Sequence, residues 1–114
     1  MDVEHQRRIA NNESLFRSHN EAIRDAVVSF QALADDAATH GFMCECPITE
    51  CEETLELTMA QYEEGRSHPT WFLVKPEHML AGGEHMVHDR GAYWIVAKDG
   101  AGREVAEARA PRTP

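Results

Sequence analysis

The N-terminal third of the chain has no proline or glycine from residue 2 to residue 40, and this limits the fold more than any other feature. Apolar residues recur in it every seven positions, which is typical of an amphipathic helix. We predict one long helix over residues 3–39, ended by Gly41. Two helices separated near Asn12 or Ser18 are the alternative. The recurring residues are Ile9, Phe16, Ile23, Phe30 and Ala37.

The other face of this helix carries charges of alternating sign at helical spacing. Glu13, Arg17, Glu21 and Arg24 follow one another at intervals of three or four residues. Such charges usually form a solvated, salt-bridged face. The apolar stripe needs a partner, which is either the rest of the domain or a second chain. We therefore expect a protein partner, or self-association, through the long helix.

The remainder of the chain reads as short strands joined by turns. Thr58 and Gln61 fit a capping box that opens a short helix ending near residue 64. The segment DGAG at 99–102 is typical of a hairpin turn, and 103–110 reads as an edge strand or a helical turn. Runs that alternate or are rich in β-formers predict strands within 53–59, 70–74, 84–89 and 92–98.

This order of elements predicts an α+β fold. We expect the long N-terminal helix to pack on a small antiparallel sheet of three to five strands, with a short helix in between. Residues 1–110 should form a single zinc-binding domain, followed by a disordered tail over 111–114.

Composition excludes several classes of function. The formal net charge of −9 argues against binding to a nucleic-acid backbone, which requires clustered Lys and Arg. No apolar run approaches the ~18 residues of a membrane span. The first residues, MDVEHQRRIANNE, lack the apolar centre of a secretion signal. We therefore expect a cytoplasmic protein with neither nucleic acid nor membrane as a partner.

The three cysteines of the chain lie within eight residues, at Cys44, Cys46 and Cys51. An odd number in a reducing compartment favours metal binding over a disulfide framework. Three thiolates this close can bind one tetrahedral Zn²⁺, and the ion would offset the repulsion from the glutamates around them. The alternatives are small buried side chains, or a redox pair formed by Cys44 and Cys46.

A tetrahedral site needs a fourth ligand. Of the seven histidines, His78 ranks first, because it follows a predicted strand in a loop that can fold back onto the cysteines. His40 ranks second, because it lies four residues before Cys44. An acid such as Glu50, or a water molecule, is a further alternative.

Three segments carry a resemblance to a known group of proteins. They are FMCECPITEC, YEEGRSHPTWFLVKPEHM and YWIVAKDG, preceded by the helix segment NNESLFRSHNEAI. Together they resemble a family of small, uncharacterised actinobacterial-type proteins, which has a Cys-x-Cys-x4-Cys segment and a downstream Pro-x-His element. The resemblance implies a Cys3His metal site in which His78 is the histidine. The family usually has glycine before that histidine, where this chain has Glu77.

No motif in the sequence indicates catalysis. The His-x-Glu and Pro-Cys-x-x-Cys pattern of zinc deaminases is missing, as are His-Glu-x-x-His and phosphate-binding loops. The sequence therefore favours a non-enzymatic zinc protein with a structural Cys3His site, acting by protein–protein interaction as a regulator or adaptor. A thiol and zinc redox-responsive regulator is the alternative, and a small metallohydrolase is a further one.

Overall fold

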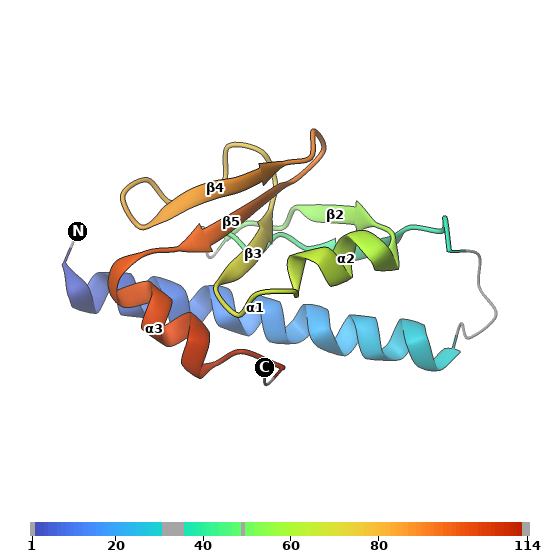
Figure 1. The fold of residues 1–114 in the computed structure, drawn as a ribbon, viewed down its shortest axis with the longest axis horizontal. Coiled ribbons are helices and arrows are strands. Elements are labelled where there is room, and N and C mark those ends of the chain that lie inside the picture. The colour runs from blue at the N-terminus through green and yellow to red at the C-terminus, as the bar shows by residue number, and fades with distance from the viewer. Residues whose placement is uncertain (1, 31–35, 49, 113–114) are drawn as a thin grey trace.

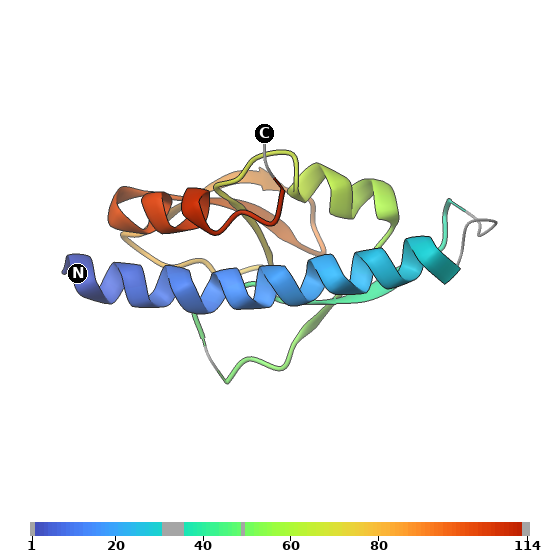
Figure 2. The ribbon, with the colours of Figure 1, turned by 90° about the horizontal axis from the view of Figure 1, so that it is seen from below.

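The computed structural model describes residues 2–30, 36–48 and 50–112. One long helix, α1, runs along the 47 Å axis of the molecule, with the strands and α2 above it and α3 crossing it in this view (Figure 1). A second view shows α3 alongside the N-terminal half of α1 (Figure 2). The elements are α1 (Val3–Phe30), β1 (His40–Met43), β2 (Thr54–Leu57), α2 (Met59–Gly65), β3 (Trp71–Val74), β4 (Glu84–Asp89), β5 (Trp94–Lys98) and α3 (Gly100–Ala108).

The strands form two antiparallel sheets, so the predicted α+β class is confirmed. β1 pairs with β2, and the second sheet has the order β3-β5-β4. The short helix was also placed correctly, since the Thr58 hydroxyl accepts from the Gln61 amide and the Gln61 side chain accepts from Thr58 N. No helix in the described part of the chain has the length and apolar character needed to cross a membrane.

The predicted end of the long helix is wrong. The helix is continuous over Val3–Phe30, without the alternative break, but residues 36–39 are turn and irregular chain. Residues 31–35 lie outside the described residues. Gly41, the predicted stop, belongs to β1 and pairs with Glu56. The seven-residue apolar repeat thus extends further along the sequence than the helix does. The chain instead turns back so that β1 pairs with β2.

The C-terminal segment is helical, so the predicted hairpin turn at 99–102 is also wrong. Asp99 precedes the first turn of α3, and Gly100 begins the helix with a φ of 58°. Of the two alternatives for residues 103–110, the helical one holds through Ala108. Small residues let α3 approach α1 closely, since a side-chain carbon at Gly102 would lie 3.5 Å from Ala10 Cβ.

The most buried face of α1 is polar, which corrects the prediction of a solvated charged face. Glu13 and Arg17 are at most 1 % exposed, whereas the stripe residues Ile9, Phe16 and Ile23 are only half-buried. The charged residues of α1 find partners on other elements, among them Lys98, Glu63 and Arg112. The buried residues of this face are Ala10, Glu13, Ser14, Arg17 and Asn20.

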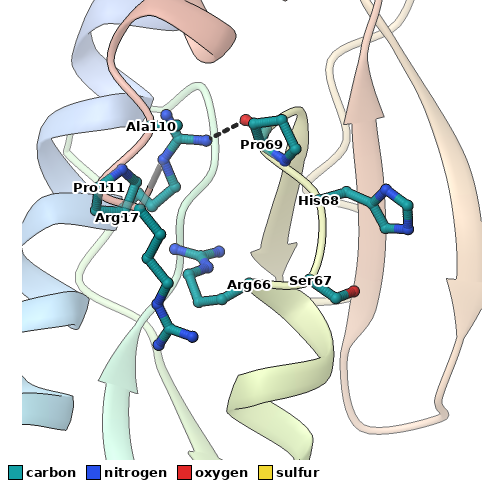
Figure 3. Close-up of a pocket in the computed structure, with 8 residues that line it drawn as sticks. Arg17, Arg66, Ser67, His68, Pro69, Ala110 and Pro111 are labelled. Atoms are coloured by element: carbon teal, nitrogen blue, oxygen red, sulfur yellow. Dashed lines mark hydrogen bonds between the residues drawn. The ribbon is translucent and has the colours of Figure 1, made fainter. Parts of the chain in front are cut away.

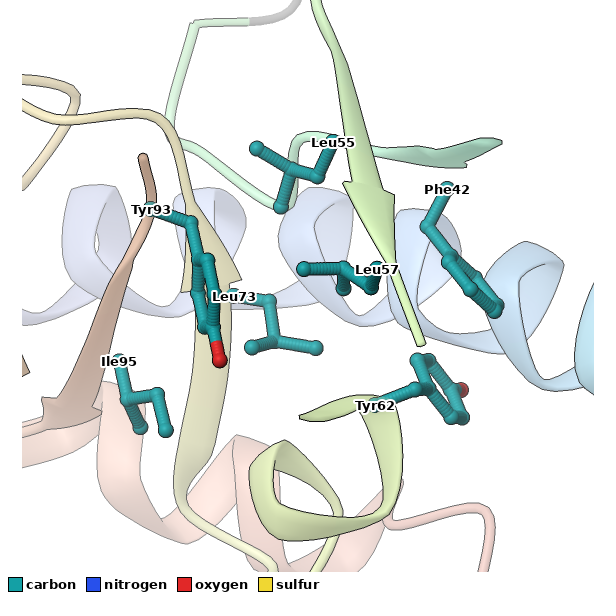
Figure 4. Packing of buried hydrophobic residues seen from close by; sticks show 7 residues of the cluster. All are labelled: Phe42, Leu55, Leu57, Tyr62, Leu73, Tyr93 and Ile95. Carbon is teal, nitrogen blue, oxygen red and sulfur yellow. The ribbon is translucent and has the colours of Figure 1, made fainter. Parts of the chain in front are cut away.

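The hydrophobic core lies between the two sheets and the helices (Figure 4). The Phe42 and Tyr62 rings stack with centroids 4.4 Å apart, which packs β1 against α2. A second group of buried residues, with Phe72, Val74 and Val96 at its centre, adjoins the cysteines. The first group is Phe42, Leu55, Leu57, Tyr62, Leu73, Tyr93 and Ile95.

A buried charge cluster ties α1 to the three-stranded sheet. Lys98 Nζ forms an ion pair with Glu13 and lies 3.4 Å from a carboxylate oxygen of Glu84, and all three side chains are at most 1 % exposed. Two acids thus share one cation. Burial and the neighbouring Glu84 raise the pKa of Glu13 well above its ordinary value. We conclude that Glu13 holds a proton in the folded protein over a range in which the unfolded chain releases it.

We predict opposite effects for two substitutions in this cluster. Lys98→Met leaves Glu84 buried without a cation and should cost about 3–5 kcal/mol in the free energy of unfolding. Glu13→Gln keeps the shape of a protonated carboxyl. The raised pKa of Glu13 contributes stability to the wild type that is lost as pH rises above about 4.5. The free energy of unfolding of Glu13→Gln, relative to the wild type, should therefore increase between that pH and about pH 8. Urea unfolding at both pH values measures this. A difference in stability between the Gln variant and the wild type that is the same at both pH values would contradict it.

Candidate metal centre

Two loops, one between β1 and β2 and one between β3 and β4, bring four possible metal ligands together. Cys44 and Cys46 directly follow β1, Cys51 precedes β2, and His78 lies in the loop after β3. Backbone hydrogen bonds shape these loops. They join Cys44 N to Glu53 O, Cys51 N to Ile48 O, and His78 N to Lys75 O, each at 3.1 Å.

The donor atoms of Cys44, Cys46, Cys51 and His78 all lie within 4.8 Å of one another. His78 Nδ1 is 3.7 Å from Cys44 Sγ and 3.6 Å from Cys51 Sγ. In a tetrahedral site with ordinary metal–sulfur and metal–nitrogen bonds, sulfur and nitrogen ligands lie ~3.6 Å apart. All three cysteines are free thiols. The group therefore has the composition and spacing to hold a metal ion.

The electrostatics of the thiols favour capture of a cation. The Cys44 thiol hydrogen-bonds to Cys46 and lowers the pKa of Cys46 to about 5. The same hydrogen bond, together with burial, raises the pKa of Cys44, and burial raises that of Cys51. One thiolate is thus available at neutral pH, and the other two thiols require a cation to lose their protons. The Lys75 amide donates to Cys44 Sγ at 3.2 Å, which further stabilises negative charge there.

Glu45 stands between the first two cysteines and points away from them into the interior. Its Oε1 accepts from Arg66 Nη2 at 2.5 Å and from Leu73 N at 2.9 Å. Its Oε2 accepts from Arg66 Nη1 at 2.9 Å and from Asn20 Nδ2 at 2.7 Å. No local pattern indicates this role, because Arg66 is 21 residues away. Glu45 fixes the backbone that carries both cysteines to α1, α2 and β3.

The alternative fourth ligands lie elsewhere. His40 is the first residue of β1, where it pairs with Leu57. Glu50 is an exposed residue. Neither belongs to the ligand group that the described residues form. His78, the first-ranked candidate, is the histidine that lies against the thiols.

Comparison with known proteins gives no further assignment. No family model, curated protein or solved structure matches this chain.

The residue before His78 has an unusual backbone. Glu77 has a φ of 73°, in the left-handed region that favours glycine, and its side chain is exposed. An L-residue there carries a steric cost of ~1–2 kcal/mol that glycine avoids. The chain accepts this cost in the turn that directs His78 toward the cysteines.

We predict that Glu77→Gly raises the free energy of unfolding by roughly 0.5–1 kcal/mol, because relief of the left-handed strain exceeds the added flexibility of the unfolded chain. Denaturant unfolding measures the change. Glu77→Ala is the matched control, since alanine removes the side chain but keeps the strain. Equal stability of the Gly and Ala variants would show that the turn is unstrained.

Proposed function

We propose that Cys44, Cys46, Cys51 and His78 bind one Zn²⁺ that serves a structural purpose. Zinc is favoured because three thiolates and one imidazole form a common structural zinc set. The observation that carries the proposal is the separation of about 3.6 Å between His78 Nδ1 and the sulfur of Cys51. Zinc supplies the positive charge that three adjacent thiolates require.

Four protein donors support a structural site over a catalytic one. A catalytic zinc keeps one position for water, whereas this set fills a tetrahedral shell. The cysteines come from the loop between β1 and β2, and His78 comes from the loop after β3. One ion would therefore join the two-stranded sheet to the three-stranded sheet. In a domain of this size such a cross-link contributes a large part of the stability.

We also propose that the domain acts by binding another protein or a second copy of itself through α1, as a regulator or adaptor. Leu15 and Val28, two large apolar side chains on α1, are 55 % and 47 % exposed. A partner that covers this part of α1 would bury these apolar side chains.

The zinc proposal predicts one zinc per chain in protein purified under reducing conditions, measured by elemental analysis. Cys51→Ser and His78→Ala should each weaken zinc binding roughly 100-fold or more and lower the melting temperature, because each removes a ligand from the complete shell. Chelation should lower the wild-type melting temperature in the same way.

His40→Ala is the matched control for these ligand variants, because His40 lies outside the ligand group. It should keep full zinc content and zinc-dependent stability. Wild-type protein that is fully folded and metal-free after zinc supplementation would refute a structural zinc site. Equal zinc affinity of His78→Ala and His40→Ala would remove His78 from the ligand set.

The redox-responsive alternative is favoured by one observation, the partial exposure of Cys51, which gives an oxidant access to the edge of the cluster. A structural site predicts that zinc-loaded protein keeps its metal at peroxide concentrations that oxidise the thiols of the chelated protein. A colorimetric zinc indicator and circular dichroism follow both states in parallel. Rapid zinc release with loss of helix–sheet packing would favour the redox regulator instead.

A further inference from the structure

A cavity of about 210 Å³ lies beside Arg66. Three arginines line it: Arg17 from α1, Arg66 after α2 and Arg112 after α3. The rest of the wall comes from the segment 67–69 and from Ala110 and Pro111. Figure 3 shows the hydrogen bond from Arg17 to the Pro69 carbonyl, while the His68 ring points away from Arg17 and Arg66. The lining of the cavity thus combines arginines with apolar residues.

Arg17 is the unusual member of this wall. Its side chain is buried, with the residue 1 % exposed, and its guanidinium lies 4.5 Å from the Phe72 ring centre. Nη1 donates to Pro69 O at 2.6 Å and Nη2 to Ala106 O at 2.8 Å, and it forms no ion pair with a described carboxylate. Burial, followed by the nearby Arg66, lowers the pKa of Arg17 to about 10. Its charge is thus poorly compensated.

Two N–H groups in this wall lack acceptors. The Nε atoms of Arg17 and Arg66 are both buried and have no hydrogen-bond partner among the described residues. Buried donors without acceptors are costly, so they usually mark a place where a water or a ligand binds. Both groups belong to side chains that line the same cavity.

The charges around the cavity indicate how much negative charge it can accept. The Glu45 carboxylate neutralises Arg66 in a bidentate pair. Arg112 is paired with Glu21 and Glu63 at once. Arg17 is therefore the one lining arginine without a paired carboxylate in the described chain. One negative charge would give Arg17 a counter-ion, whereas a dianion would add a second charge to a cluster in which Arg112 already binds two carboxylates.

We propose that this cavity binds a small organic carboxylate. A carboxylate matches the planar guanidinium fork and can accept from N–H groups of Arg17 and Arg66. Its apolar part would lie against Pro69, Ala110 and Pro111. Since water occupies ≈30 Å³ per molecule in the liquid, the cavity has room for a ligand of only a few carbons. This site is independent of the zinc proposal, because no metal ligand lines it.

Propionate tests the proposal directly, with ¹⁵N-labelled wild-type protein at constant ionic strength. We expect saturable shifts of arginine Nε–H signals and of the Ser67 and Ala110 amides, with a dissociation constant of about 1 mM, as expected for so small a ligand. Propionamide has the same shape without the charge and should give no saturable shift. Inorganic phosphate and chloride are the competing anions, and both should bind at least ten times more weakly.

A pair of variants locates the binding. Ala110→Phe fills the cavity without changing any charge, so it should abolish the propionate shifts while the fold persists. Ala108→Phe adds the same ring at an exposed position of α3 and should bind as the wild type does. The proposal is overturned if the wild type shows no saturable propionate binding. Equal binding of propionamide, stronger binding of phosphate, or unchanged binding by Ala110→Phe would overturn it too.

Discussion

The bidentate ion pair between Glu45 and Arg66 is the interaction on which the rest of the structure depends. Both side chains are almost fully buried, and the carboxylate also accepts from Asn20 on α1 and from the backbone of β3. Removing either partner would leave an isolated buried charge, which is strongly destabilising. The pair links two sites, because Glu45 lies between two cysteines and Arg66 lines the cationic cavity. The metal centre and the cavity are thus held by one buried contact.

The parts of the fold that local sequence determines were predictable. Runs that alternate or are rich in β-formers identified β2 and the three strands of the second sheet, and the capping box at Thr58 identified α2. The cysteine spacing also carried enough information to suggest a metal site, since ligands five and two residues apart need only one tight loop. His78 could be ranked first because a loop after a strand can return toward the cysteines, as it does in the structure.

The parts that depend on distant partners were not predictable. Glu13 and Arg17 have the spacing of a solvated helix face, but Lys98 and the carbonyls of Pro69 and Ala106 lie more than 50 residues away. Charged side chains can occupy a buried face only when such partners exist, and periodicity does not reveal them. The end of the long helix was predicted wrongly for a related reason. Pairing of β1 with β2 overrides the helical preference around residue 40.

X-ray absorption at the zinc edge tests the proposed zinc site most directly, because it measures the ligand shell of the metal. Our interpretation predicts three sulfur scatterers at ~2.3 Å and one nitrogen at ~2.0–2.1 Å, with imidazole outer-shell features that disappear in His78→Ala. A first shell of mostly oxygen and nitrogen, or a zinc-edge spectrum that the loss of His78 leaves unchanged, would contradict the Cys3His site.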